Sequence, residues 1–290
     1  LAGLQCSKLL WFHCHGKEHF PPGDESTQAI FDQGHEVGKL AQRLFPDGVE
    51  IKTEHHQFAE TLRCSREALK LRKPLFEAGF QSGNAFARTD ILNPVGKDQW
   101  NIIEVKSATS VKDVNLDDLA LQRYALEGAG LKIRKCHLFY INKKYVRQGD
   151  IQPRQLFTQE DRTVDVSECL RDVEKNLERM AAIIRLKSHP DIAIGPNCNK
   201  PYPCPLQPLC WKHVPEDSVF NLTNVLQTKA FEWFSNGYRR LSDLSSQVVH
   251  LTPKQNIQVE ATKSGRPFVD SKAIREFIAL LQNPLCFLDF

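Results

Sequence analysis

The stretch FARTDILNPVGKDQWNIIEVK, residues 86–106, predicts a β-hairpin around which the other elements of the chain can be placed. Turn formers gather in its middle at residues 93–96, with extended, partly apolar segments on either side. Asp90 and Glu104 are equally distant from Lys97 in the sequence. If the hairpin is symmetric about Lys97, the two carboxylates lie opposite each other and their Cβ atoms are roughly 4.5–5.5 Å apart.

Strand alternation adds a lysine to this pair of carboxylates. Lys106 is two residues beyond Glu104 and is therefore expected on the same face of the strand. Two close carboxylates raise the pKa of one of them unless a cation neutralises them, and Mg²⁺ prefers such oxygen ligands. The lysine could then hold a phosphate or an attacking water. The alternative from the residues alone is a surface hairpin with a Glu–Lys pair.

The composition is that of a globular protein large enough for one sizeable domain and a smaller one. The chain has 290 residues, 25% charged and 41% hydrophobic, and a net charge of +3 that does not by itself indicate a polyanionic partner. No apolar run of about 18 residues is present, so we expect no membrane contact. The odd number of nine cysteines favours a reducing, cytoplasmic setting. The N-terminus lacks a signal-peptide pattern and begins without Met, which suggests a trimmed or partial chain.

Hydrophobic periodicity predicts alternating helices and strands. Helices are expected over residues 30–45, 54–73, 115–129 and 167–188, and strands over 76–80 and 135–142, with short extensions at 156–157 and 163–166. This order indicates an α/β fold with a mixed sheet flanked by helices.

Four more residues could join the hairpin carboxylates. His35 borders the apolar face of the first helix, where it is either a hydrogen-bonded core-edge histidine or a group that reaches a site on the sheet. Glu77, in the strand before the hairpin, could be a further accessory acid. Gln122 and Tyr124 are the notable polar side chains of the helix that follows the hairpin.

Two basic groups could track phosphates, although a solvated helix face is the simpler interpretation of the first. The first recurs at helical spacing and consists of Arg63, Arg66, Lys70 and Lys73. The second follows the strand at 135–142 and consists of Lys143, Lys144 and Arg147.

The segment GPNCNKPYPCPLQPLCW carries three equally spaced cysteines, Cys198, Cys204 and Cys210. Its prolines predict a rigid loop with little regular hydrogen bonding, which a thiolate-bound metal would staple. A closed site needs a fourth ligand, for which we favour Cys6, with Cys14 as second choice. Zn²⁺ and a [4Fe–4S] cluster both accept four thiolates, so the spacing leaves both open.

Together these features resemble the PD-(D/E)XK nuclease superfamily, in particular RecB-like nucleases with an iron–sulfur staple, a group that includes CRISPR-associated nucleases. In that pattern a helix-borne His, an Asp and a Glu-x-Lys occur in this order. The matching segments here are GHEVGKLA with His35, ARTDIL with Asp90, and IIEVKSAT with Glu104 and Lys106.

Two parts of the family pattern are matched with departures. The family continues with a helix carrying Gln-x-x-x-Tyr; Gln122 fits, but Leu126 stands four residues on and Tyr124 only two. The family takes one cluster cysteine before the nuclease core and three after it, as Cys6 and the late cysteines would provide. The first two late cysteines are further apart here than is common in the family.

The resemblance covers residues 1–213 and implies a nuclease domain with the cysteine cluster. The segments GHEVGKLAQRLFPDGV, LFYINKKYVRQGD and PYPCPLQPLCW are most similar to a bacterial family in which a DEDD-type exonuclease-like domain follows. The final PLCFLDF would be its first strand and Asp289 its first acid, so that second domain is expected to be missing here. Residues 214–290 would be a helical connector, either helix–hairpin–helix-like and DNA-binding or a plain linker.

The resemblance implies a Mg²⁺- or Mn²⁺-dependent deoxyribonuclease acting on single-stranded DNA or DNA ends. Its site residues would be His35, Asp90, Glu104 and the Val105 carbonyl as cation ligands, with Lys106 and Gln122 as further catalytic groups. A [4Fe–4S] cluster, or Zn²⁺ in its place, would be the second cofactor. The alternatives are a catalytically inactive nuclease fold that binds DNA and a zinc-stapled interaction module.

Overall fold

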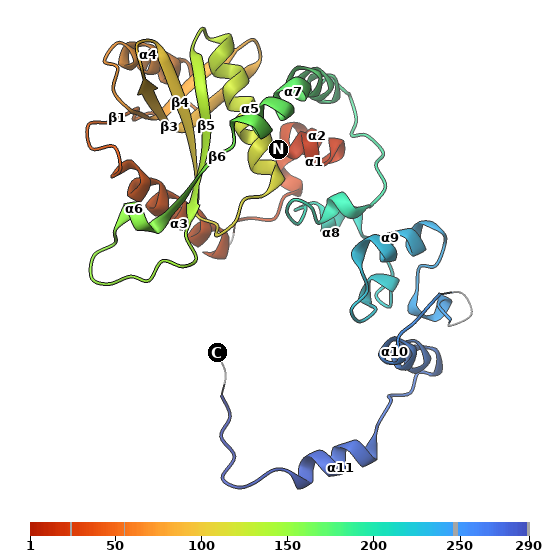
Figure 1. Ribbon diagram of the computed structural model, residues 1–290. Helices are drawn as coiled ribbons and strands as arrows, with labels where there is room; N and C mark the ends of the chain where they lie inside the picture. The colour runs from red at the N-terminus through yellow and green to blue at the C-terminus, as the bar shows by residue number, and fades with distance from the viewer. Residues whose placement is uncertain (24, 55, 246–248, 289–290) are drawn as a thin grey trace. The chain divides into compact units, whose positions relative to one another are not determined.

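The computed structural model describes residues 1–23, 25–54, 56–245 and 249–288. Contacts within the chain divide it into two units, one of residues 1–192 with 200–206 and one of residues 193–199 with 207–290. The first unit contains a six-stranded sheet and the second is built of short helices (Figure 1). None of the helices within the described ranges is long and apolar enough to cross a membrane.

The sheet has its strands in sequence order from edge to edge. Its strands are β1 (Val49–Glu50), β2 (Leu75–Ser82), β3 (Ala85–Val95), β4 (Gln99–Lys106), β5 (Lys132–Ile141) and β6 (Phe157–Asp161). β1 pairs with β2 and β4 with β5 in parallel, while β2–β3, β3–β4 and β5–β6 are antiparallel. The sheet is therefore mixed, and with helices on both faces it confirms the predicted α/β class.

Helices precede, separate and follow these strands in the first unit. They are α1 (Ala2–Gln5), α2 (Ser7–His15), α3 (Glu25–Gln42), α4 (Phe58–Leu69), α5 (Asp113–Gly128), α6 (Pro153–Leu156) and α7 (Thr163–Ile184). The predicted helices and strands are confirmed with shifted ends. The predicted extension at 163–166 is wrong: the extended segment is β6, and Thr163 already begins α7.

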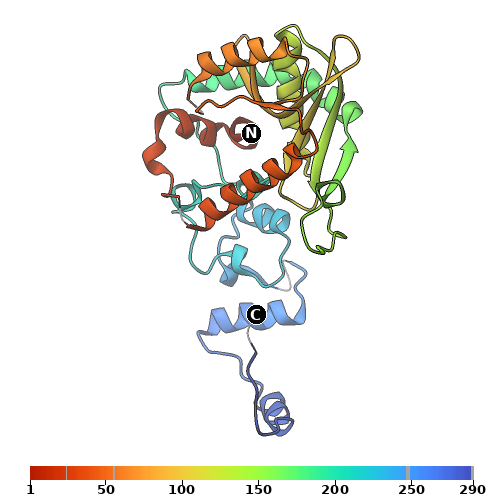
Figure 2. The same ribbon diagram turned by 90° about the vertical axis from the view of Figure 1, so that its left-hand side faces the viewer.

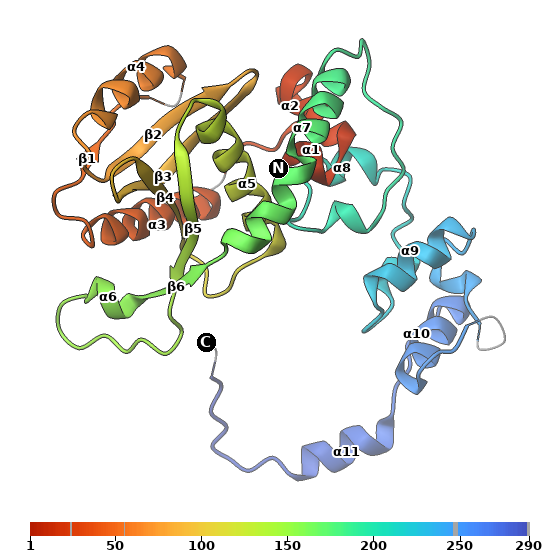
Figure 3. The same ribbon diagram turned by 45° about the horizontal axis from the view of Figure 1, so that its top comes forward.

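Alternating residues on the strands bury two different cores. Leu92, Ile102 and Leu138 pack with α4, α5 and α7 on one face (Figure 3). Their sequence neighbours Ile91, Ile103 and Phe139 pack with α3 and α6 on the other (Figure 2, α3 in orange-red). Because both faces are covered, these strands are apolar on both sides, as expected for a buried sheet.

The predicted hairpin register is correct. The β3–β4 ladder runs from the pair Ile91–Ile103 to the pair Val95–Gln99, and it is symmetric about Lys97. The turn is shorter than predicted, because positions 93 and 94 belong to β3. Gly96 in this turn has φ +57°, a conformation that glycine adopts without a steric cost.

The second unit has a small core of its own. Its main helices are α8 (Gln207–Cys210), α9 (Gln227–Ser235), α10 (Pro253–Ser264) and α11 (Ser271–Ala279). Val219, Trp233, Leu244 and Val259 are among its buried residues. The helices expected here are present, while a DNA-binding helix–hairpin–helix remains a prediction. Asp289 lies outside the described residues.

Candidate active site

The predicted carboxylates open into one cavity of about 480 Å³ in the first unit. Its lining comes from α3, from the segment after β1, and from the strands β2, β3 and β4. The polar side chains that line it include His35, Lys39, Glu77, Arg88, Asp90, Glu104 and Lys106. The structure thus brings together the His, the Asp and the Glu-x-Lys that the sequence analysis singled out.

Asp90 interrupts the hairpin ladder and faces β4. The next pair after Ile91–Ile103 would be Asp90–Glu104, but the ladder ends before it. Instead, the Asp90 carboxylate accepts a hydrogen bond from the Val105 backbone N–H, with an Oδ2–N distance of 2.7 Å. The two strands part at the site, and a side chain takes the place of a backbone acceptor. This hydrogen bond holds the Asp90 carboxylate in a fixed position.

The ladder between β2 and β3 is also interrupted at Asp90, at the position of Glu77 on β2. The β2–β3 ladder pairs Phe76 with Ile91 and Ala78 with Thr89 but omits Glu77 and Asp90. Glu77 has φ +58°, a left-handed conformation that is uncommon for a residue with a side chain. Three carboxylates, on β2, β3 and β4, therefore occupy corresponding positions in the register beside the cavity.

Glu104 is buried and both of its carboxylate oxygens are engaged. It is 5% exposed. Lys106 Nζ lies 2.5 Å from its Oε1, and the Gln122 amide donates to its Oε2 at 2.6 Å. Lys106 also donates to Asp118 Oδ2 at 3.1 Å. Lys106 is therefore on the same side as Glu104, as predicted, and α5 supplies two side chains that support the strand residues.

The pKa values of the carboxylates are raised, as expected for acids that share a buried site. Burial is the largest cause of the raised pKa of Glu104, the charge of Asp90 adds to the rise, and Lys106 offsets part of it. Burial also raises the pKa of Asp90 against the lowering effect of the Val105 N–H. The pKa of Glu77 is shifted in the same direction, mainly by burial. Lys106 has a raised pKa because Glu104 and Asp118 outweigh the effect of its burial.

The chemistry of these donors suits a divalent cation, whereas the placement of their side chains in this structure does not yet form a coordination site among the described residues. Buried carboxylates are costly as charged groups, and a hard cation with oxygen ligands removes that cost. Gln122 is 3% exposed, and its Oε1 atom has no hydrogen-bond partner among the described residues. That orphaned acceptor would suit a water beside the carboxylates. The described ranges contain no group of three or more His, Cys, Asp or Glu side chains placed to hold a metal ion.

α3 contributes both polar side chains, among them His35 and Lys39, and two large apolar ones to the cavity wall. His35 lines the cavity and is exposed. It is not the core-edge histidine of the alternative interpretation. Ile30 and Phe31 line the same cavity and are 63% and 60% exposed. Tyr124 is different, because it packs against the hydrophobic core on α5.

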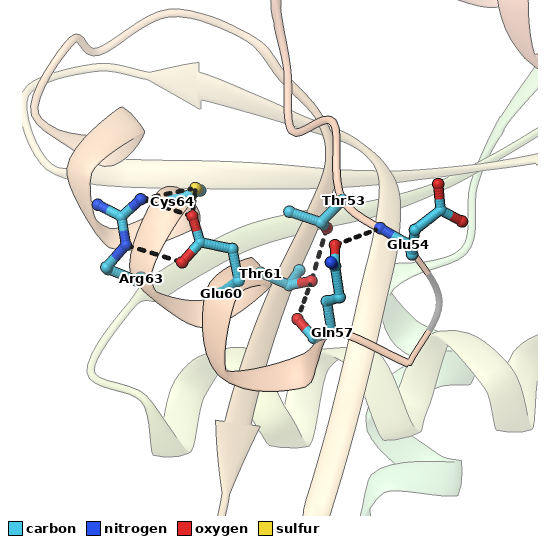
Figure 4. A network of polar contacts seen from close by, with 7 residues as sticks. All are labelled: Thr53, Glu54, Gln57, Glu60, Thr61, Arg63 and Cys64. Carbon is cyan, nitrogen blue, oxygen red and sulfur yellow. Dashed lines mark hydrogen bonds and ion pairs between the residues drawn. The ribbon is translucent and has the colours of Figure 1, made fainter.

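Two of the four residues of the predicted basic stripe, Arg63 in α4 and Lys70 just after it, pair with acids of α4. Arg63 donates two hydrogen bonds to Glu60, at 2.9 and 2.6 Å (Figure 4). Lys70 pairs with Glu67 at 2.7 Å. Arg66 and Lys73 are exposed. Phosphate tracking by this stripe stays a prediction, with half of its positive charge already matched.

The second basic group borders another hollow. Lys143 and Lys144 line a depression of about 340 Å³ together with Thr109, Ser110 and Tyr140. Tyr140 is the strand partner of Lys106, so the depression begins at the residue next to the carboxylate site. Arg147 instead donates to the carbonyl of Gly149.

The cysteine quartet stays a prediction. Cys6 and Cys204 belong to the first unit and Cys198 and Cys210 to the second. Cys198 lies at the end of a short 3-10 helix and accepts a hydrogen bond from the Gly195 N–H at 3.5 Å. Cys14 is an exposed residue of α2.

Two residues of the site were missed by the sequence analysis. Asp118 precedes Gln122 by one helical turn, a spacing that would have placed it on the same side of α5. Arg88 precedes Asp90 by two residues and donates to the Thr53 carbonyl and the Thr61 hydroxyl, which fixes the segment after β1. Thr61 in turn bonds Thr53 and the Gln57 carbonyl (Figure 4).

We compared the chain with known families, curated proteins and solved structures. No family model and no curated relative matches the chain. Among solved structures, it is similar to a crystal structure of an alkaline exonuclease (LHK-Exo) from Laribacter hongkongensis. The match has 12% sequence identity and a TM-score of 0.27, and it covers 63% of this chain and 88% of that chain.

Proposed function

We propose that the first unit is a metal-dependent nuclease that hydrolyses phosphodiester bonds of DNA, with single-stranded DNA or DNA ends as substrate. The observation that carries the proposal is the pair of half-buried Asp90 and buried Glu104, which meet Lys106 in one cavity. A stabilising structural role does not account for them, because charged acids this close raise each other's pKa. Such clusters are typical of sites that hold a cation.

Asp90, Glu104 and the Val105 carbonyl would hold Mg²⁺ or Mn²⁺, and His35 would add a nitrogen ligand, which suits Mn²⁺ better than Mg²⁺. When bound, the cation would polarise the phosphate and lower the pKa of a water. Lys106 would orient that water or stabilise the charge that develops on the phosphate. Gln122 would accept a hydrogen bond from the water through its open Oε1.

Features of the cavity wall support a nucleic-acid strand as substrate. Ile30 and Phe31 offer exposed apolar surface beside the acids, and unstacked bases pack against such side chains. Lys143 and Lys144, at the neighbouring depression, would contact phosphates further along the strand. Paired bases do not present their faces, so this wall favours single strands and frayed ends.

The test is cleavage of labelled single-stranded and double-stranded DNA and of RNA, with Mg²⁺, with Mn²⁺ and with chelator. The wild-type protein should cut DNA only with a cation. Asp90→Ala and Lys106→Ala should each lower the rate by roughly a hundredfold or more, as loss of a charged catalytic group does. Cleavage by either variant at the wild-type rate would refute the site.

A further inference from the structure

We infer that Asp118 is a positioning residue that keeps the Lys106 ammonium in the site when Glu104 binds a cation. This inference rests on the proposed function. The ammonium lies between two carboxylates from different elements, 2.5 Å from Glu104 Oε1 on β4 and 3.1 Å from Asp118 Oδ2 on α5. Asp118 acts through Lys106 and needs no contact of its own with cation or substrate.

Glu104 cannot serve Lys106 and a cation equally well. Its Oε1 atom accepts from Lys106 and its Oε2 atom from Gln122, so a cation must compete for an oxygen that already has a partner. The positive charge of Lys106 would also repel a cation bound to the same oxygen. With Glu104 as its only acceptor, Lys106 would either oppose cation binding or leave the site.

Asp118 offers the second acceptor from a rigid position. It precedes Gln122 by one turn of α5, and both side chains point toward β4. Leu119, next to Asp118, is fully buried in the core between α5 and the sheet, which fixes the helix. Lys106 is the last residue of β4, where its long side chain can turn from one carboxylate to the other. The ammonium can thus release Glu104 and stay beside it.

A purely structural role for the pair would be to tie α5 to β4. The two roles differ in one respect. If the pair is only a structural tie, loss of the Asp118 carboxylate should lower thermal stability. If Asp118 positions Lys106, its loss should lower cation affinity and turnover, and should do so only in a protein that still has Lys106. Asp117 supplies the matched control, because it lies on the same turn with the same charge but makes no ion pair with Lys106 within the described chain.

The experiment compares Asp118→Asn, Asp118→Glu and Asp117→Asn in the full chain, each alone and with Lys106→Met. Mn²⁺ binding is measured by electron paramagnetic resonance of the free ion, and kcat and KM are measured on a single-stranded DNA oligonucleotide. Asp118→Asn should weaken Mn²⁺ binding by about threefold to tenfold and lower kcat by about tenfold, while KM for DNA changes less than about twofold. Asp118→Glu should keep most of the wild-type Mn²⁺ affinity and kcat. Asp117→Asn should leave both quantities within about twofold of the wild-type values.

In the Lys106→Met background, Asp118→Asn should have no further effect on Mn²⁺ binding. An equal effect with and without Lys106, or equal effects of Asp118→Asn and Asp117→Asn, would overturn the inference. If the wild-type protein binds Mn²⁺ but cleaves no nucleic acid, the proposed function fails, and the binding measurements still decide the role of Asp118.

Discussion

Two ion pairs of nearly equal length behave in opposite ways in this protein. Lys106 lies 2.5 Å from Glu104, and the two side chains are 28% and 7% exposed. Arg63 lies 2.6 Å from Glu60, and the two side chains are 64% and 47% exposed. The Arg63 hydrogen bond lowers the pKa of Glu60 to about 2. The pKa of Glu104 is instead raised, because burial and the charge of Asp90 outweigh Lys106.

The difference shows that the distance within an ion pair does not by itself decide whether the pKa of its carboxyl group is lowered or raised. On the exposed face of α4, water solvates both charges, so the pair adds little and can be removed at little cost. In the cavity, the ammonium group of Lys106 only partly offsets the cost of desolvating the carboxylates of Glu104 and Asp90. The cavity pair thus leaves negative charge that a metal ion would neutralise, while the α4 pair leaves none.

Removing the cationic partner from each pair gives the largest expected contrast. Without metal at pH 10, Lys106→Met should lower the free energy of unfolding by about 2 kcal/mol, because a buried carboxylate loses its partner while Lys106 itself is partly exposed. Arg63→Met should leave the thermal midpoint nearly unchanged. The measurement is thermal unfolding followed by circular dichroism at several pH values.

The pH dependence of this contrast has a definite sign. The pKa of Glu104 in the folded state is above its ordinary value, and loss of Lys106 raises it further. Folding then favours the protonated form, so stability falls as the pH rises toward the folded-state pKa. Because the pKa of Glu104 is raised to about 8 and rises further without Lys106, the cost of Lys106→Met should grow between pH 7 and pH 10. A cost that stays constant over this range would contradict the raised pKa.

Neutralising Asp90 should change stability in the opposite direction and by a smaller amount. Asp90→Asn keeps an oxygen that can accept from the Val105 N–H and removes a charge whose pKa is raised by burial. At pH 8 without metal, the variant should be more stable by about 1 kcal/mol, and this gain should disappear near pH 4.

The second measurement on Asp90→Asn is the change in its thermal midpoint when Mn²⁺ is added. Mn²⁺ should raise the thermal midpoint of the wild-type protein, since a ligand of the folded state stabilises it, and should do so far less in Asp90→Asn. An Asp90→Asn variant that is destabilised at pH 8 would show that the charge of Asp90 is favourable in the folded state. Desolvation would then not dominate the energetics of the cavity.

The hairpin explains how much of the site was predictable from sequence. Equal spacing about Lys97 predicted the correct register, because a short turn leaves an antiparallel pair little freedom to slip. The end of the ladder at Asp90 was not predictable, since it depends on a side chain that replaces a backbone acceptor. The left-handed backbone of Glu77 has no sequence signal, because such positions normally favour glycine.

The basic stripe on and after α4 shows which sequence signals were left out of the prediction. Its cations were identified from their spacing, but Glu60 and Glu67 precede Arg63 and Lys70 by three residues and were equally visible in the sequence. Residues three apart on a helix are neighbours and form pairs. Two of the four cations are thus paired on the surface of the helix, and phosphate tracking by the stripe stays a prediction. Asp118 was missed in a similar way, since its spacing to Gln122 was not used.

The smallest expected effect concerns Glu77, where backbone strain and side-chain charge can be separated. Its left-handed φ of +58° costs a residue with a side chain about 1 kcal/mol. Glu77→Gly should relieve that cost and remove the carboxylate, whereas Glu77→Ala removes the carboxylate and keeps the strain. Glu77→Gly should therefore be more stable than Glu77→Ala by about 1 kcal/mol in urea unfolding.

Both variants should lose Mn²⁺ affinity to the same modest extent, because only the shared loss of charge reaches the cavity. If Glu77→Gly kept wild-type affinity while Glu77→Ala lost it, the backbone and not the carboxylate would matter for the site. Equal stabilities of the two variants would mean that the chain around Glu77 relaxes once its side chain is gone. The left-handed turn would then depend on the Glu77 side chain and would not be imposed by the surrounding strands.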